Sequence, residues 1–173
     1  MGVLSQSPLL PVDIWFRRLN TLALPKTLIL RFYAQDIVTG PGQTSYEIAR
    51  SNITAMSPTS FGQLYMVDNQ LNTGPDPNSP RVGRRQGLAG FSDLNEPALY
   101  LSFIFVFQGG LYNGSTISVV GRSRIADNER ELSIVGGTGV FRLARGIVIY
   151  STYSRNSTTG NSVFKYTLYF TYY

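Results

Sequence analysis

Apolar and polar residues alternate along several short segments of this chain, and alternation with a period of two is typical of half-buried β-strands. The clearest segments are 25–35 and 162–173. In the first, one face carries Leu28, Leu30, Phe32 and Ala34, and the other carries Ile29, Arg31, Tyr33 and Gln35. In the second, Phe164, Tyr166, Leu168, Phe170 and Tyr172 alternate with Lys165, Thr167, Tyr169 and Thr171. Each segment is predicted to pack one face on a core.

Similar patterns, separated by clusters of Gly, Pro, Asn, Asp and Ser, predict further strands. The predicted strands are 25–35, 48–55, 61–68, 82–91, 98–107, 115–123, 132–135, 141–152 and 162–173. No segment combines a period of 3.6 with helix caps, so residues 1–25 are expected to form an irregular arm and residues 26–173 one domain. About eight strands predict an all-β fold, a closed antiparallel barrel or a sandwich. An eight-stranded barrel can hold one small ligand.

The composition narrows the class of protein. The chain has 173 residues, of which 43% are hydrophobic and 14% charged, so it can bury a sizeable core. Its formal net charge is +5, which is compatible with a basic solvated exterior or with an anionic partner such as an acidic polysaccharide. The arginines are scattered and form no basic tail, so no nucleic-acid partner is expected.

The absence of Cys and His excludes several chemistries. Without Cys there is no thiol nucleophile, disulfide or cysteine zinc site, and without His the commonest metal ligand and general base is missing. We therefore expect no metal and no cofactor. Any acid–base chemistry must use Asp, Glu, Lys, Tyr or water.

No membrane-spanning helix is expected either. The longest apolar stretch, residues 99–107, is too short to cross a bilayer as a helix. The first residues lack the cationic start and long apolar core of a secretory signal peptide. Met1 and Gly2 are compatible with a chain from which such a peptide has been removed.

Asp36 is the sharpest chemical signal, because it falls on the apolar face of the first predicted strand. A carboxylate buried there is costly unless it is paired or neutral. Burial would raise its pKa and allow it to act as an acid or base near neutral pH. The alternative is that the strand ends at Asp36 and the side chain caps a turn before Gly40.

Two glycine positions admit a structural and a functional interpretation. Gly121 shares the inner face of its predicted strand with Val119 and Ser123, which leaves room for a ligand or for a bulge. The segment 135–139, Val-Gly-Gly-Thr-Gly, lacks the ending of a phosphate-binding loop. It is therefore expected to be a tight turn that needs a positive φ.

Three Asn-x-Ser/Thr tripeptides are possible N-glycosylation sites. They begin at Asn52, Asn113 and Asn156. Each one alone is weak evidence, but three in loop or strand-edge positions favour a secreted, extracellular glycoprotein.

Several motifs occur in a specific order along the chain. They comprise residues 32–37 (Phe-Tyr-Ala-Gln-Asp-Ile), 67–71 with Gly74 and Pro75, 82–87 (Val-Gly-Arg-Arg-Gln-Gly), 105–107, 112–116 and 135–146. In order and spacing the chain resembles the plant dirigent protein family over roughly residues 27–173. The first 25 residues lie outside the resemblance.

The resemblance implies an eight-stranded antiparallel β-barrel of the dirigent and allene-oxide-cyclase type, usually a secreted, N-glycosylated homotrimer of the cell wall. Family members bind phenoxy radicals or quinone methides from phenol oxidation and direct the stereochemistry of their coupling, typically in lignan biosynthesis. A separate laccase or peroxidase performs the oxidation. Some members act on quinone methides as cyclases or dehydratases.

The resemblance also implies site residues. Asp36 matches the pocket aspartate of the family's Phe-Tyr-x-His-Asp-Ile motif, in which Gln35 replaces the His. Arg130 matches a pocket arginine, although a surface position in the loop 127–131 is the alternative. Ser123 stands where lignan-forming members carry a second pocket aspartate, and Ala89 stands where many carry a Tyr. The implied catalytic residues are Asp36, Arg130 and Ser123, and the implied substrate-binding residues are Phe32, Val119, Ala89 and Thr152.

Three functions remain open at this point. The first is a protein that binds and orients phenolic radicals or quinone methides. The second is a true cyclase or dehydratase with Asp36 as acid–base and Arg130 or Ser123 stabilising developing charge. The third is a non-catalytic wall-binding barrel, which the positive net charge favours. The absence of a second pocket carboxylate at Ser123 weakens the second.

Overall fold

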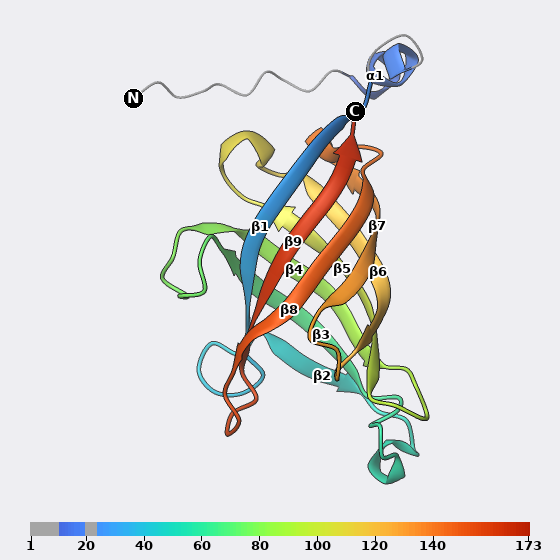
Figure 1. Cartoon of the computed structure of the whole chain (residues 1–173), viewed down its shortest axis with the longest axis vertical. Helices are drawn as coiled ribbons and strands as arrows, with labels where there is room; N and C mark the ends of the chain where they lie inside the picture. Colours follow the sequence, from blue (N-terminus) through green and yellow to red (C-terminus); the bar gives the residue numbers. More distant parts are fainter. Residues whose placement is uncertain (1–10, 20–23) are drawn as a thin grey trace.

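The computed structural model describes residues 11–19 and 24–173, which fold into one antiparallel sheet and a short helix (Figure 1). The helix is α1 (Val12–Leu19), and the strands are β1 (Lys26–Asp36), β2 (Ser45–Ala49), β3 (Leu64–Asn72), β4 (Arg81–Phe91), β5 (Ala98–Phe107), β6 (Thr116–Arg124), β7 (Arg130–Thr138), β8 (Arg145–Arg155) and β9 (Ser162–Tyr172). Three 3₁₀ turns lie at Thr54–Met56, Gly110–Tyr112 and Gly139–Phe141.

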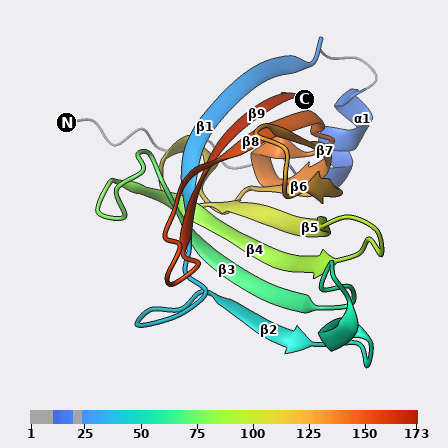
Figure 2. The same ribbon diagram turned by 60° about the horizontal axis from the view of Figure 1, so that its bottom comes forward.

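Strand pairing closes the sheet into a barrel. The order is β1-β9-β8-β7-β6-β5-β4-β3-β2, and an additional β1–β3 pairing joins the two edges. The end of β3 pairs with β1, with Tyr33 opposite Asn72, whereas its beginning pairs with β2, with Ser45 opposite Val67. β2 therefore continues the position of β1, as Figure 2 shows, and eight strands close the barrel. The predicted all-β antiparallel barrel is confirmed.

Aromatic side chains fill one end of the barrel. Phe141, in the 3₁₀ turn after β7, is fully buried, and its ring lies 5.4 Å from Phe107 and 4.9 Å from Tyr112. The rings of Phe170 and Tyr172 lie 5.3 Å and 5.4 Å from it on the β9 side. The core fills this end of the barrel, so a ligand is expected to bind at the other end.

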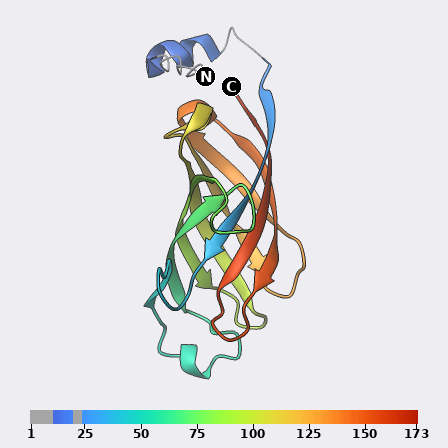
Figure 3. The same cartoon turned by 90° about the vertical axis from the view of Figure 1, so that its left-hand side faces the viewer.

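The sequence pattern predicted an irregular N-terminal arm, but part of this arm is helical. Residues 12–19 form α1, with Asp13 in its first turn and Arg17 in its last turn, an arrangement that suits the helix dipole. Two turns are too short to display a repeated helical period, which explains the error. The Trp15 ring lies 5.2 Å from the Arg142 guanidinium, so α1 contacts the closed end of the barrel (Figure 3). Neither α1 nor any other described helix has the length and apolar character to cross a membrane.

Several predicted strand boundaries are also wrong. The strand predicted over 48–55 ends at Ala49, and the chain then turns because the Thr54 hydroxyl donates a hydrogen bond to the Phe61 carbonyl at 2.7 Å. In the glycine segment, β7 continues through Thr138, and the positive φ that a tight turn needs occurs at Gly139, with a value of 62°. That turn places Phe141 in the barrel end, and β8 begins only at Arg145.

Candidate functional site

The open end of the barrel contains a cavity of about 480 Å³, a size typical of small-molecule sites. It lies among the last residues of β1, β4 and β8 and the first residues of β5, β7 and β9. Its walls are largely apolar or aromatic, with Val67, Ala89, Phe91, Leu99, Leu101, Tyr150 and Phe164, and its polar groups include Asp36, Arg85, Arg130 and Thr152. An apolar cavity with a few converging polar groups suits an aromatic ligand with polar substituents.

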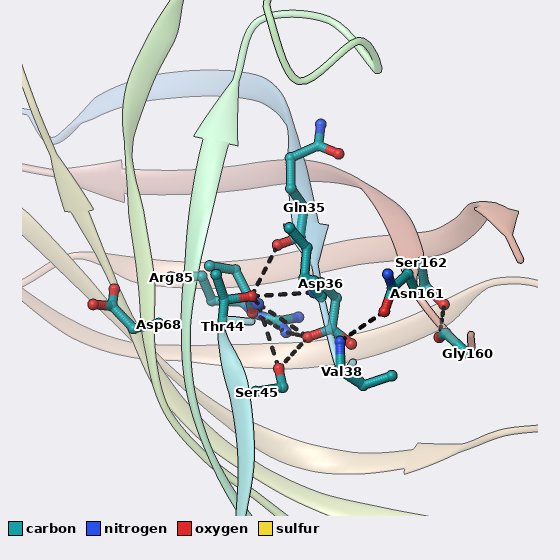
Figure 4. Close-up of polar contacts among 12 residues, drawn as sticks. Gln35, Asp36, Val38, Thr44, Ser45, Asp68, Arg85, Gly160, Asn161 and Ser162 are labelled. Carbon is teal, nitrogen blue, oxygen red and sulfur yellow. Dashed lines mark hydrogen bonds and ion pairs between the residues drawn. The ribbon is translucent and has the colours of Figure 1, made fainter. Parts of the chain in front are cut away.

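Asp36 ends β1 at the cavity and is held by a set of donors (Figure 4). The Ser45 hydroxyl donates a hydrogen bond to its Oδ1, the Asn69 amide donates another at 2.9 Å, and an Arg85 guanidinium nitrogen lies 3.6 Å from the same oxygen. The side chain keeps 15% of its exposure. Since all three contacts use Oδ1, Oδ2 is the oxygen best placed to exchange a proton with a ligand.

Arg85 is the buried cation beneath Asp36. Its Nε donates to the side-chain Oδ1 of Asn69 at 2.9 Å and its Nη1 to the Tyr166 hydroxyl at 2.5 Å. Burial acts to lower the pKa of Arg85, but interactions with Tyr166 and Asp36 outweigh it and leave that pKa above its ordinary value. Burial raises the pKa of Tyr166 to about 12, although Arg85 opposes this shift. Both groups therefore keep their ordinary charge states at neutral pH.

Sequence reasoning missed Arg85 as a site residue. A signal was available, because Arg85 lies four positions before Ala89 on the same strand and so shares its inward face. An arginine at an inward position of a strand is expected to have a partner, and Asp36 and Asn69 are those partners.

Arg130 lies across the cavity from this cluster in a mainly aromatic setting. Its Nη2 donates a hydrogen bond to the Thr152 hydroxyl at 2.7 Å, and its guanidinium stacks 4.5 Å from the Tyr150 ring. Tyr150 in turn stacks on Tyr166 at 5.1 Å with an interplanar angle of 11°. Within residues 11–19 and 24–173, the buried Nε of Arg130 has no hydrogen-bond partner. The alternative of a surface arginine is excluded by its burial, with only 9% exposure.

The other predicted site residues divide into two groups. Ala89 and Thr152 line the cavity together with Asp36 and Arg130. Ser123, Phe32 and Val119 do not line it.

Ser123 is buried behind Tyr150 and shares a hydrogen bond with the Tyr150 hydroxyl, so it can position that ring without reaching a ligand. Phe32 and Val119 are core residues, and Phe32 packs on Phe105 at 4.9 Å. They face inward as predicted, but they lie several residues closer to the closed end of the barrel than the ends of their strands, which are Asp36 in β1 and Arg124 in β6. The alternation of apolar and polar residues reveals which face of a strand a side chain occupies, but it does not reveal how deep in the barrel that side chain lies.

The space expected at Gly121 is filled by the protein itself. A Cβ at this position would lie 2.9 Å from Leu132 Cδ2. The bulge lies on the neighbouring strand β7, where Val135 is the extra residue between the partners of Ser118 and Val119. Gly121 therefore accommodates Leu132 and gives a ligand no additional room.

The chemistry available at this site is acid–base and electrostatic. In the described part of the chain, no three acidic side chains come together as a metal site would need. The predicted glycosylation positions Asn52, Asn113 and Asn156 are all exposed and lie in connections outside the strands. Asn156 follows Arg155, which lines the cavity mouth.

Comparison with known proteins agrees with this fold. The family model described as dirigent-like protein matches residues 27–171. Dirigent protein 23 of Arabidopsis thaliana is 40% identical over 152 residues, which cover 88% of this chain and 81% of the relative. Pterocarpan synthase 1 of Glycine max is 38% identical over 145 residues, covering 83% of this chain and 78% of the relative.

A solved structure supports the same assignment. The structure of a pterocarpan synthase dirigent protein superposes with a TM-score of 0.81 at 34% identity, and the match covers 88% of each chain. The family match begins one residue after the predicted domain start at residue 26 and spans all the barrel strands except the ends of β1 and β9. This chain belongs to the dirigent protein family.

Proposed function

We propose that this protein binds phenoxy radicals or quinone methides of phenylpropanoids in its barrel and biases the stereochemistry of their coupling or cyclisation. The observation that carries the proposal is the cavity itself, an aromatic-walled space with a partly exposed carboxylate at Asp36 and a guanidinium at Arg130. Such a site can hold a planar phenol by its faces and fix its direction by two polar anchors.

The proposed reaction needs an oxidant that is not part of this chain. A laccase or peroxidase removes one electron and one proton from each phenol, and two radicals join by one carbon–carbon bond to give a quinone methide. A hydroxyl group then adds to the quinone methide carbon, loses its proton, and the quinone oxygen gains one. Asp36 Oδ2 is placed to carry that proton, while the walls decide which face is attacked.

Stereochemical bias requires little energy. A tenfold preference for one face corresponds to about 1.4 kcal/mol between two transition states. A few contacts in a rigid barrel are enough to supply that difference.

The test is chiral chromatography of products made from a panel of monolignols by a laccase, with and without this protein. We expect an enantiomeric excess that depends on the protein and falls strongly in Asp36→Asn. Asp68→Asn is the matched control, because Asp68 is a carboxylate on the neighbouring β3 that pairs with Arg84 on the outer face, away from the Asp36 cluster (Figure 4). Racemic products with every substrate would overturn the proposal.

A second function is favoured by one observation, the similarity to relatives named pterocarpan synthase. In this alternative, a ligand hydroxyl takes a proton from Asp36 and leaves as water, and the phenol releases its own proton to solvent to form the quinone methide. An internal hydroxyl then adds to the quinone methide carbon and closes a ring. It returns a proton to the Asp36 carboxylate, and the quinone oxygen takes up a proton from solvent to become a phenol again. Turnover of such a precursor without any oxidant would favour this function over the first.

The setting proposed for this activity is extracellular. Family membership, together with exposed asparagines at positions 52, 113 and 156, supports a secreted glycoprotein of the apoplast or cell wall. Mass spectrometry of protein secreted from plant cells, before and after glycan removal, would identify the occupied sites. Unmodified asparagine at all three positions would contradict this part of the proposal.

A further inference from the structure

The charged groups that line the cavity are unbalanced. The lining contains three arginines, Arg85, Arg130 and Arg155, and one carboxylate, Asp36. Arg85 forms the ion pair with Asp36, at 3.6 Å. The Asp36 carboxylate therefore pairs with Arg85, and it forms no ion pair with Arg130.

Arg130 has no carboxylate partner in the described residues. Its recorded contacts are the Thr152 hydroxyl and the faces of Tyr150 and Phe164, and its buried Nε donates to nothing within residues 11–19 and 24–173. Acidic side chains do occur at this end of the barrel, but Asp93, Glu96 and Asp127 pair with the exposed Arg122 and Arg124. Glu129 and Glu131, on either side of Arg130 in the chain, are exposed and form no ion pair with it in the described residues.

A guanidinium that is nine-tenths buried without an anion is unfavourable. An anionic ligand group that enters the cavity removes this cost, and a carboxylate fits best, since its two oxygens match the fork of guanidinium donors. Tyr150 and Phe164 flank the same guanidinium, so a ligand that reaches it passes between aromatic walls.

We propose that the preferred ligand is a phenol that carries a carboxylate, as hydroxycinnamic acids do, and that Arg130 binds this carboxylate while Asp36 serves the phenolic or quinone methide end. This inference rests on the proposed function, because it assumes that the cavity accepts phenols. It adds that the acid is preferred over the corresponding neutral ester or alcohol.

The experiment compares 4-hydroxycinnamic acid with its methyl ester by isothermal titration calorimetry at neutral pH. The two probes share ring, phenol and chain and differ in one charge. The ester lacks the charge-assisted contact to the guanidinium, so we expect the wild-type protein to bind the acid at least about tenfold more tightly. Arg130→Met should abolish the preference, whereas Lys165→Met, which removes one exposed positive charge from the outer face of β9, should retain it.

Equal affinity for acid and ester in the wild type overturns the inference and leaves the proposed function standing, because the ester still binds. If neither probe binds, this inference is overturned, and the enantiomeric excess with the monolignol panel decides the proposed function separately. A preference that persists in folded Arg130→Met, or that disappears in Arg155→Met, assigns the effect to another charge and also overturns it. Should Arg130→Met fail to fold, Arg130→Lys is the second variant. It keeps the charge without the planar fork and should reduce the preference without eliminating it.

Discussion

Two adjacent arginines on β4 have opposite environments, although the sequence presents them as a simple pair. Arg84 faces outward and contacts the half-exposed Asp68, whereas Arg85 faces inward and joins Asp36, Asn69 and Tyr166. Strand alternation causes this difference. In the inner cluster each polar side chain has its hydrogen-bond or ion-pair partner within the cluster, so the removal of one side chain leaves another without a partner.

The two arginines should therefore respond very differently to the same substitution. Arg85→Met leaves Asp36 without its cation and Asn69 without its donor, and we expect a loss of about 3–5 kcal/mol in the free energy of unfolding. Arg84→Met breaks a surface pair and should cost about 1 kcal/mol or less. Urea unfolding of both variants checks this, and equal losses would contradict the assigned roles.

The raised pKa of Tyr166 predicts that the stability of the protein changes with pH. Its pKa is about 12 in the folded protein and about 10 when exposed. Below pH 10 both states hold the proton. Between pH 10 and 12 only the unfolded state releases it, so stability should fall as the pH rises through this window, by roughly 3 kcal/mol.

Denaturant unfolding of wild type and Tyr166→Phe between pH 8 and about 12 measures this effect. The variant should lose less stability over the window, because its ring cannot ionise. Parallel pH profiles for the two proteins would show that Tyr166 does not titrate as described.

At the scale of elements, the connection from β7 to β8 determines which end of the barrel is open. The strand runs through Thr138, turns at Gly139 and inserts Phe141 between the strands, so the barrel is closed there. β8 then starts at Arg145 and approaches β9 closely at Gly146. A Cβ at Gly146 would lie 2.0 Å from the Tyr169 carbonyl oxygen.

Gly146 should therefore tolerate no side chain, in contrast to Gly121. Gly146→Ala meets backbone, which cannot move aside without separating β8 from β9, so its cost should reach the upper end of about 1–3 kcal/mol or exceed it. Gly121→Ala meets the terminal carbon of Leu132, which can rotate, and should cost less than about 1 kcal/mol. Thermal unfolding ranks the two variants, and the reverse order would refute this account of the close approaches.

At the scale of the whole molecule, the barrel has apolar residues on two separate outer faces. Tyr46 on β2 and its register partner Met66 on β3 are 54% and 46% exposed. Ile29 on β1, Tyr169 on β9 and Ile147 on β8 form a second row of register partners, each at least 38% exposed. A cyclic trimer needs two different patches on each chain that contact each other, and we propose these two rows for that contact.

We therefore expect the homotrimer that the family resemblance implies, with one row of each chain against the other row of its neighbour. Light scattering coupled to size exclusion should give three times the chain mass. Met66→Glu and Tyr169→Glu should each shift the protein towards monomer, whereas Leu111→Glu, at an exposed position outside both rows, should not. A monomeric wild type would contradict this assembly.

The sequence by itself determined the class of fold and several residues of the site. Successive side chains along a strand point to opposite faces, so the inward faces of β1 and β9 could be identified without any knowledge of their partners. The same parity indicated that Asp36 faces inward, and motif order identified the family and with it Arg130, Ala89 and Thr152. Loop boundaries such as Ala49 and the helix α1 were missed, because side-chain hydrogen bonds and short length conceal them from periodicity.

Only the tertiary structure decided which inward residues share a cavity. Depth in a barrel depends on the register between strands and on which end Phe141 closes, and both are set by pairings between residues far apart in the chain. For this reason Phe32 and Val119 belong to the core, Ser123 stands behind Tyr150, and Arg85 joins Asp36. The uncompensated charge of Arg130 likewise follows from its three-dimensional neighbours. Asp36 pairs with Arg85, Asp93 and Glu96 pair with exposed arginines, and Glu129 and Glu131 are exposed to solvent.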